Sequence, residues 1–276
     1  MREFTKVCER AARAGGRRLL ELRGTARVRE KGPGDLVTEA DLASQEAIRE
    51  VLGKAFPDHA FIGEEGTPRE TGVSGPPAEY CWIVDPLDGT TNYVHGLDHF
   101  CVSVALRRGG EVLVGTVLDP VREECFSACL DGGAWLNGRR LAPSRVADLG
   151  AALIAASFPP RVRRGSAEVA RFLEVLYRCQ SMRRLGSAAL NLCYIASGRL
   201  DAYWATNVRI WDVAAAGLIV HEAGGMLTDD RGGPFDLDRP VLAASATAEL
   251  HRQLLAALAE ADGWGTDRSA FSGRLG

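Results

Sequence analysis

The chain has 276 residues, of which 46 % are hydrophobic and 25 % charged, with a formal net charge of −3 at pH 7. This composition is typical of a globular protein and excludes collagen-like, coiled-coil and largely disordered chains. A charge so close to neutral does not indicate a nucleic acid or an anionic membrane as partner, and we expect neither.

The cysteines and the chain start indicate the compartment. Seven cysteines form an odd set without a CxxC pair, and most lie among apolar residues, so we expect buried thiols in a reducing cytoplasm. The N-terminus lacks an apolar signal segment, and apolar runs such as 149–158 are far shorter than the roughly 20 residues that cross a membrane. Arginine pairs such as Arg17-Arg18 are scattered, which favours codon usage over a surface that reads phosphates.

Helical and extended patterns alternate along the chain. Apolar residues at three-to-four spacing predict a helix over 4–22, and breakers predict a loop over 30–35. Thr38 with Asp41 forms a capping pair that opens a second helix ending near Phe56. The later elements are expected in this order: strand 60–63, loop 66–79, strands 80–84, 100–107, 112–118 and 125–129, a hairpin of 133–136 with 139–141, strand 151–157, helix 167–179, strand 182–184, helix 190–197, strand 201–204, and helices 213–223 and 246–261.

An antiparallel β half is therefore followed by a mixed α/β half. Such a sequence of elements predicts layers of helix and sheet with a cleft between the halves. We expect one domain over residues 1–262, with an N-terminal half of about 1–145, a C-terminal half of about 146–262, and a flexible tail over 263–276.

Four groups of carboxylates stand at the ends of predicted elements, and they indicate the chemistry. Like charges repel, and each raises the pKa of its neighbours, so such gathering is costly without a cation. Carboxylate and carbonyl oxygens favour Mg²⁺, Mn²⁺ or Ca²⁺ over zinc. The groups are Asp35 with Asp41, Glu64-Glu65, Asp85 with Asp88, and Asp212.

The third group also predicts an anion site. Asp85 and Asp88 flank a turn stiffened by Pro86, so both carboxylates and the Leu87 carbonyl can face one point. Asp88-Gly89-Thr90-Thr91 resembles a helix start, whose free N–H groups bind anions. Cations beside a helix N-terminus favour hydrolysis of a phosphate ester.

These segments resemble the inositol monophosphatase family. The resemblance is carried by Gly63-Glu64-Glu65, by Trp82-Ile83-Val84-Asp85-Pro86-Leu87-Asp88-Gly89-Thr90-Thr91-Asn92, and by Trp211-Asp212-Val213-Ala214 through Glu222-Ala223-Gly224-Gly225. It implies an αβαβα layered α/β sandwich of the inositol monophosphatase and fructose-1,6-bisphosphatase type. It also implies hydrolysis of a phosphomonoester with two to three Mg²⁺ ions, by a homodimer.

The resemblance also assigns roles to residues. It implies metal ligation by Glu64, Asp85, the Leu87 carbonyl, Asp88 and Asp212, with Asp85 bridging two ions. It implies catalytic roles for Glu64, Thr90 and Asp41: Thr90, with Glu64 behind it, orients the attacking water, and Asp41 and Lys31 belong to an early loop near a third metal. Substrate contacts are implied for the following residues: Asp88, Gly89, Thr90, Gly186, Ser187, Ala188 and Asp212.

The substrate is less determined than the metal chemistry. The resemblance predicts a ring-binding glutamate seven residues before Asp212, where this chain has Ala205, and Asn207 or Arg209 are its candidate replacements. We therefore expect an inositol-1-phosphate phosphatase that accepts other sugar and polyol phosphates. Fructose 1,6-bisphosphate, histidinol phosphate and 3′-phosphoadenosine 5′-phosphate remain alternative substrates.

Other classes of protein were weighed against this interpretation. His95 and His99 could form a zinc pair, but no HExxH motif supports it. Ser187 lies outside any GxSxG motif, and neither GxxxxGK[ST] nor GxGxxG occurs. A binding protein associated with RNA polymerase or ribosomal RNA processing remains open as an alternative of another class.

Overall fold

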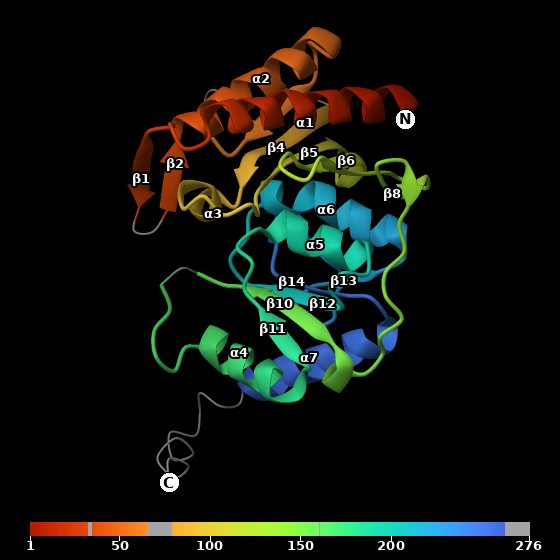
Figure 1. Ribbon diagram of the computed structural model, residues 1–276. Helices are drawn as coiled ribbons and strands as arrows, with labels where there is room; N and C mark the ends of the chain where they lie inside the picture. Colours follow the sequence, from red (N-terminus) through yellow and green to blue (C-terminus); the bar gives the residue numbers. More distant parts are fainter. Residues whose placement is uncertain (33–34, 66–78, 160, 263–276) are drawn as a thin grey trace.

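The computed structural model describes residues 1–32, 35–65, 79–159 and 161–262. Its helices and sheets stack in five layers: a helix pair, a seven-stranded sheet, a second helix pair, a five-stranded sheet and a third helix pair (Figure 1). The αβαβα sandwich expected from the sequence is confirmed. The expected tail, 263–276, lies outside the described residues.

The first layer consists of α1 (Arg2–Leu22) and α2 (Glu39–Ala55). The expected capping pair opens α2: the Thr38 hydroxyl accepts from Ala40 N at 3.1 Å, and the Asp41 carboxylate accepts from Thr38 N at 2.8 Å. The two helices approach closely at Gly15, where a Cβ would lie 2.6 Å from the Ser44 hydroxyl. Small residues on α1 therefore allow α2 to pack closely, and this packing places the carboxylate and amide side chains of α2 against the sheet.

The prediction of a loop over residues 30–35 was wrong. Two strands, β1 (Val28–Gly32) and β2 (Asp35–Thr38), pair antiparallel from Val28–Thr38 to Gly32–Asp35. The residues on either side of 33–34 satisfy their backbone groups by pairing with each other.

The seven-stranded sheet holds most of the predicted β half. The prediction that the second strand ends at Val84 was wrong, because the strand continues through Pro86 to Asp88 with a register shift between Asp85 and Asp88. The Asn137-Gly138 turn has φ of 48° and 81°, as two-residue hairpins require. In spatial order the strands are β3 (Ala60–Gly63), β4 (Tyr80–Asp88), β5 (Cys101–Arg108), β6 (Glu111–Asp119), β7 (Glu124–Cys129), β8 (Gly133–Leu136) and β9 (Arg139–Arg140).

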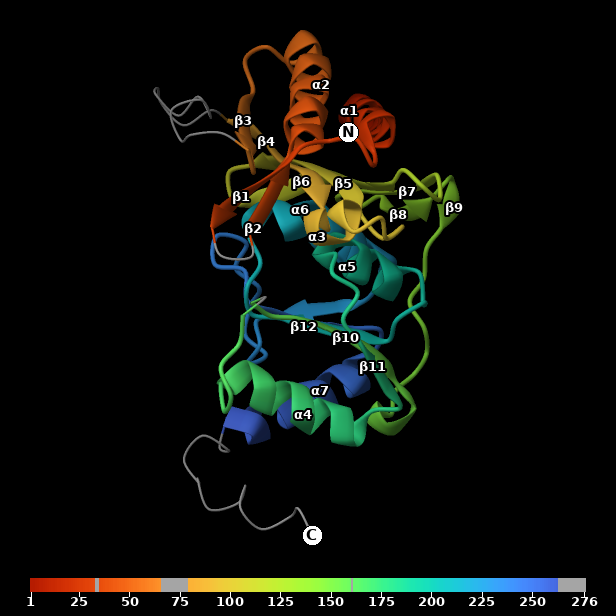
Figure 2. The ribbon, with the colours of Figure 1, turned by 60° about the vertical axis from the view of Figure 1, so that its left-hand side comes forward.

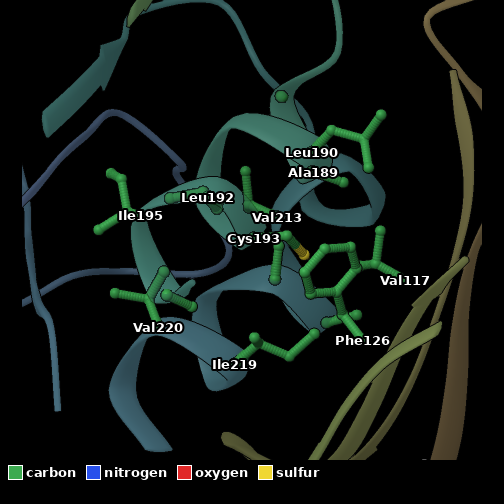
Figure 3. Close-up of a cluster of buried hydrophobic side chains, with 14 of the residues drawn as sticks. Val117, Phe126, Ala189, Leu190, Leu192, Cys193, Ile195, Val213, Ile219 and Val220 are labelled. Atoms are coloured by element: carbon green, nitrogen blue, oxygen red, sulfur yellow. The ribbon is translucent and has the colours of Figure 1, made fainter. Parts of the chain in front are cut away.

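The middle layer consists of α5 (Ala188–Ala196) and α6 (Ile210–Ala223), which are covered by a sheet on each side. Both helices are apolar on nearly every face, as buried helices are. Figure 3 shows Val117 and Phe126 of the sheet against Cys193, Val213 and Ile219 of these helices. Residues of the two predicted halves therefore share one hydrophobic core.

The five-stranded sheet is covered on its outer side by α4 (Ala167–Arg178) and α7 (Ala248–Asp262). Its strand order is β11 (Ser181–Arg183), β10 (Leu153–Ser157), β12 (Ala202–Ala205), β14 (Leu242–Ser245) and β13 (Met226–Thr228), with a 3₁₀ turn at Leu149–Ala151 and a short helix α3 (Thr90–Val94) elsewhere. The strands β13 and β14 were not predicted from the sequence, because segments of three or four residues are too short to show a periodic pattern. In the described part of the chain, no helix is both long and apolar enough to cross a membrane.

Candidate active site

The carboxylate pair of β4 lies where that strand is distorted. The register shift between Asp85 and Asp88 leaves Pro86 and Leu87 unpaired with β5, and Pro86 has no N–H to donate. The Asp85 carboxylate accepts from Leu87 N at 3.0 Å, and the Ser44 hydroxyl donates to the Pro86 carbonyl at 2.8 Å. The turn is therefore held from both sides, and Asp85 is 1 % exposed.

The second carboxylate of the pair lies at the start of α5. Asp88 Oδ2 accepts from the Ser187 hydroxyl at 2.6 Å and from Ala189 N at 2.7 Å, and Oδ1 accepts from Ala188 N at 3.3 Å. The positive end of the helix dipole stabilises a negative group at this position. The structure thus brings Gly186, Ser187 and Ala188, predicted as substrate contacts, next to Asp88.

The third carboxylate comes from the first turn of α6. Asp212 Oδ2 accepts from Arg209 N at 2.7 Å and so caps the helix, while the Ser103 hydroxyl of β5 donates to the neighbouring Trp211 carbonyl at 3.2 Å. This second contact ties the start of α6 to the sheet beside β4.

The pKa values of these carboxylates are raised, which shows that the carboxylates are buried close together and repel one another. Burial raises the pKa of Asp85 well above its usual value, and the charges of Glu64, Asp88 and Asp212 raise it further. Burial and the charge of Asp88 raise the pKa of Asp212 to about 7, although hydrogen bonds from Arg209 N and with Asp85 lower it. Burial also raises the pKa of Asp88, against the lowering effect of its bonds to Ser187 and Ala189. Shared protons relieve a repulsion that a divalent cation would relieve more completely.

The acidic pair after β3 is fixed through its backbone. Glu64 N donates to the Val84 carbonyl at 3.1 Å, and Glu65 N donates to the Gln45 side-chain carbonyl at 3.0 Å. Of the two, Glu65 is buried, whereas Glu64 is partly exposed and hydrogen-bonds with Asp85. The structure therefore joins Glu64 to the carboxylate group and turns Glu65 away into the protein.

Sequence reasoning missed the residues that hold this frame. Ser44 and Gln45 lie on the buried face of α2, one turn after Asp41, and polar residues on an otherwise apolar face were the available signal. Asn92 was missed in the same way: its amide donates to the carbonyls of His99 at 2.7 Å and Leu185 at 2.8 Å. That pair of bonds links α3 to the segment before Gly186.

Thr90 begins α3, as the sequence predicted for a helix start at this point. Its hydroxyl donates to the Leu87 carbonyl at 3.0 Å, so this carbonyl keeps one further lone pair for a cation. Gly89 has a φ of 94°, and a Cβ there would lie 2.9 Å from the His99 carbonyl. A glycine is needed at this turn because it is both left-handed and crowded.

Asp41 was predicted as catalytic, and the structure places it in the capping box of α2. Its Oδ2 accepts from the Thr38 hydroxyl at 2.6 Å, while its buried Oδ1 has no hydrogen-bond partner among the described residues. Burial raises the pKa of Asp41 to about 6, and the charge of Glu65 adds to the effect. The side chains of Lys31 and Asp35 lie outside the described residues.

A cavity of ≈ 520 Å³ opens over this frame. Asp88 and Asp212 form its acidic floor, and Arg184 lies at its edge with its guanidinium 4.1 Å from the centre of the Phe158 ring. The remaining lining residues are Leu36, Gly89, Thr90, Thr91, Asn92, Ser157, Gly186, Ala188, Asn207 and Val208. The predicted substrate contacts line the cavity with one exception, Ser187, which is fully buried and does not reach it.

The position at which the resemblance predicts a ring-binding glutamate does not lie in the cavity. Ala205 is fully buried in β12, paired with Ser157 on one side and Leu242 on the other, and it does not line the cavity. Asn207, two residues later, is exposed and does line it. The polar contact with a substrate ring is therefore available from Asn207 rather than from residue 205.

The donor set fits divalent magnesium. Buried carboxylates whose charges raise one another's pKa, a carbonyl with a free lone pair, and the unpartnered Asp41 Oδ1 are hard oxygen donors. As the side chains stand, no three acidic, histidine or cysteine groups in the described residues form a closed ligand cluster, since Asp88 and Asp212 are turned to backbone amides. His95 and His99 likewise form no zinc cluster there, and all seven cysteines are free thiols.

A five-layer α/β sandwich with an acidic cavity lined by β4, β10 and the starts of α3, α5 and α6 defines the class to which the molecule belongs, and comparison with known proteins identifies it. The model of the inositol monophosphatase family matches residues 1–262, and the chain belongs to this family. It is 41 % identical over 250 residues to Nus factor SuhB of Pasteurella multocida, covering 89 % of this chain and 92 % of that protein. It is 42 % identical over 209 residues to inositol-1-monophosphatase of Rhizobium meliloti, covering 75 % and 77 %.

The solved structures agree with the fold. The extragenic suppressor protein suhB of Bartonella henselae superposes with a TM-score of 0.87 at 36 % identity, covering 93 % of this chain and 98 % of that one. Family membership points to phosphatase activity, and the family is generally Mg²⁺-dependent.

Proposed function

We propose that this protein is a Mg²⁺-dependent phosphomonoester hydrolase that accepts inositol 1-phosphate together with other sugar and polyol phosphates. One observation carries the proposal: Asp88 and Asp212, with Thr90, line a cavity of ≈ 520 Å³ above the buried Asp85. A volume of this size suits a small-molecule substrate.

The chain's own residues would bind and orient the substrate. The start of α3, with the Thr90 hydroxyl, holds the phosphate beside the carboxylates, and Asn92 fixes α3 against the Leu185-Gly186 segment. Thr90, bonded to the Leu87 carbonyl, is placed to orient the attacking water. Asn207, Val208 and Arg184 surround the alcohol part of the substrate at the open side.

Glu64, Asp85, Asp88, Asp212 and the Leu87 carbonyl would hold the ions. Bound Mg²⁺ supplies activation of water and neutralisation of the charge that develops on the leaving oxygen. The protein contributes a buried frame that keeps these oxygens together despite their repulsion, through the bonds of Ser44 and Gln45 described above.

Broad specificity follows from the open side of the cavity. A charged acceptor at the ring position would add roughly 1.5–3 kcal/mol to recognition of one hydroxyl pattern, and the neutral Asn207 offers less. Asn207→Asp is therefore the sharper test of ring recognition, because a glutamate at the fully buried Ala205 would start inside the core.

The deciding experiment measures phosphate release with Mg²⁺ from five substrates: inositol 1-phosphate, glycerol 2-phosphate, fructose 1,6-bisphosphate, histidinol phosphate and 3′-phosphoadenosine 5′-phosphate. We expect turnover of the first with comparable turnover of glycerol 2-phosphate. A strong preference for either of the last two would contradict the assigned substrate class, and no release from any would contradict the proposal.

A second candidate function is binding of RNA polymerase or its factors. The observation in its favour is the name Nus factor that the relative from Pasteurella multocida carries. The two functions are separable, because Asp85→Asn removes turnover without altering the outer surface. Pull-down of the polymerase by both the wild type and this variant would support the binding role.

A further inference from the structure

The outer face of α1 carries a row of positive charge that the net charge of the chain conceals. Five cations recur every three or four residues on this helix, and we refer to them as the α1 stripe: Arg2, Lys6, Arg10, Arg13 and Arg17. At 3.6 residues per turn they fall within about 80° of arc. All five side chains are exposed, on the side opposite the buried Val7, Ala11 and Leu19.

The cations of the α1 stripe do not take part in ion pairs that stabilise the described part of the fold. Among the described residues, none of its members forms a salt bridge, and Arg13 alone has a recorded partner, the Cys125 thiol. By contrast, Lys54 on the neighbouring α2 pairs with Glu50, and Arg18 pairs with Glu21. Five cations without an acidic partner among the described residues, in a straight row of about 22 Å, can bind a polyanion.

An aromatic surface adjoins the N-terminal end of this row. His59 stacks between Phe56, at 4.7 Å between ring centres, and Tyr80, at 4.8 Å. These three rings, which we refer to as the aromatic hollow, line a depression of ≈ 390 Å³ with Asp58 and Glu79. Ala55 lines both this depression and a second one of ≈ 470 Å³, which Arg2, Lys6 and Arg10 line together with Glu3 and Val7.

Contacts across α1 join the two surfaces. Phe4, between Arg2 and Lys6 in the chain, lies 5.1 Å from Phe56 and 5.7 Å from Tyr80 between ring centres. Figure 1 shows that this end of α1 is the one remote from the β1–β2 hairpin, and Figure 2 shows α1 and α2 side by side on the outside of the layers. The site is thus separate from the acidic cavity, which α3, α5 and the start of α6 enclose.

We propose that the α1 stripe and the aromatic hollow bind single-stranded nucleic acid. The cations, which lie 4.5 to 6 Å apart along the helix axis at about 1.5 Å of rise per residue, take the phosphates of the backbone. The rings take an unpaired base by stacking, and the carboxylates of Asp58 and Glu79 accept from its amino groups. A duplex would present no free base face to these rings.

The inference goes beyond the proposed phosphatase activity, and its test is independent of that activity. Fluorescence anisotropy with a labelled 12-nucleotide oligo(A) RNA measures binding by the wild type. We expect a Kd of about 10⁻⁴–10⁻⁶ M that weakens with salt. The variant Arg2→Gln, Lys6→Gln, Arg10→Gln, Arg17→Gln should bind at least about tenfold more weakly, with a salt slope lower by about 3.

A matched control removes the same charge elsewhere. Arg139→Gln, Arg140→Gln, Arg145→Gln, Arg252→Gln changes four exposed arginines outside both surfaces and should bind within about twofold of the wild type. Equal weakening of the two variants would overturn the α1 stripe as the site. Both variants should release phosphate at the wild-type rate, whatever that rate is.

The base contact has its own test. Tyr80→Leu should weaken oligo(A) binding by about fivefold or more, while Tyr80→Phe, which keeps the ring, should not. Neither change should alter binding of inorganic polyphosphate of equal charge. If polyphosphate binds as tightly as oligo(A), the hollow holds no base; if polyglutamate does, the partner is an acidic protein, and the proposal is wrong.

Discussion

Like charges gather in two regions of this molecule, and the two regions treat them in opposite ways. Around Asp85 the carboxylates are buried, and each raises the pKa of the next. Along the α1 stripe the cations stand in water on one helix face, where solvent and salt screen their repulsion.

The difference explains what each region can bind. A buried group of carboxylates gains a large free energy from one compact divalent cation, because the desolvation has already been incurred in folding. An exposed row gains little per charge and needs a long polyanion to collect many weak contacts. Four experiments test this difference, beginning with the change that should have the largest effect.

Removing one buried carboxylate should have the largest effect. Asp85→Asn or Asp212→Asn should lower kcat by about two to three orders of magnitude, because polarisation by bound metal supplies several kcal/mol at about 1.4 kcal/mol per tenfold. In EDTA the same variants should unfold at a higher temperature than the wild type, since one repelling charge is gone. Full turnover of Asp85→Asn in EDTA would contradict the assignment.

The buried group should also make the metal-free protein sensitive to pH. The pKa of Asp212 is about 7 in the folded protein against 3.8 as its ordinary value, so the folded state holds its proton more tightly between these values. The free energy of unfolding in EDTA should therefore fall as pH rises from about 4 to about 7, by a few kcal/mol for the group as a whole. Urea titrations with and without Mg²⁺ measure this, and a metal-free protein whose stability does not change across that window would refute it.

The hydroxyl beside the carboxylates should matter at the level of one hydrogen bond. Thr90→Ala should lower kcat by about tenfold and change KM less, because the hydroxyl acts on the water in the transition state. Thr90→Ser, which keeps the hydroxyl, is the matched control. A large rise in KM with unchanged kcat would make Thr90 a plain substrate contact.

Neutralising the exposed row should have the smallest effect on folding. Each substitution of glutamine for Arg2, Lys6, Arg10 or Arg17 should change the free energy of unfolding by less than about 0.5 kcal/mol, because these side chains are exposed and unpaired. Denaturant midpoints of the fourfold variant and of its arginine control measure the difference. A loss of several kcal/mol would show that the row supports the structure.

Local signals in the sequence were sufficient for elements whose hydrogen bonds join residues close together in the chain. The helix over 4–22, the capping pair Thr38 and Asp41, and the Asn137-Gly138 hairpin were predicted, since their hydrogen bonds are made between residues close in the chain. The long aspartate motif indicated the family for a related reason: the spacing of Asp85 and Asp88 is that of a local turn.

Sequence by itself therefore determined the fold class, the order of most elements and the acidic residues of the site. Tertiary structure alone decided how those residues are held: Asp88 at the start of α5, Gln45 on the Glu65 backbone, and Ala205 inside the core rather than in the cavity. It also decided that the row of cations on α1 faces water, because the opposite side of this helix is buried. Such contacts join positions up to about a hundred residues apart, and no short-range periodicity encodes them.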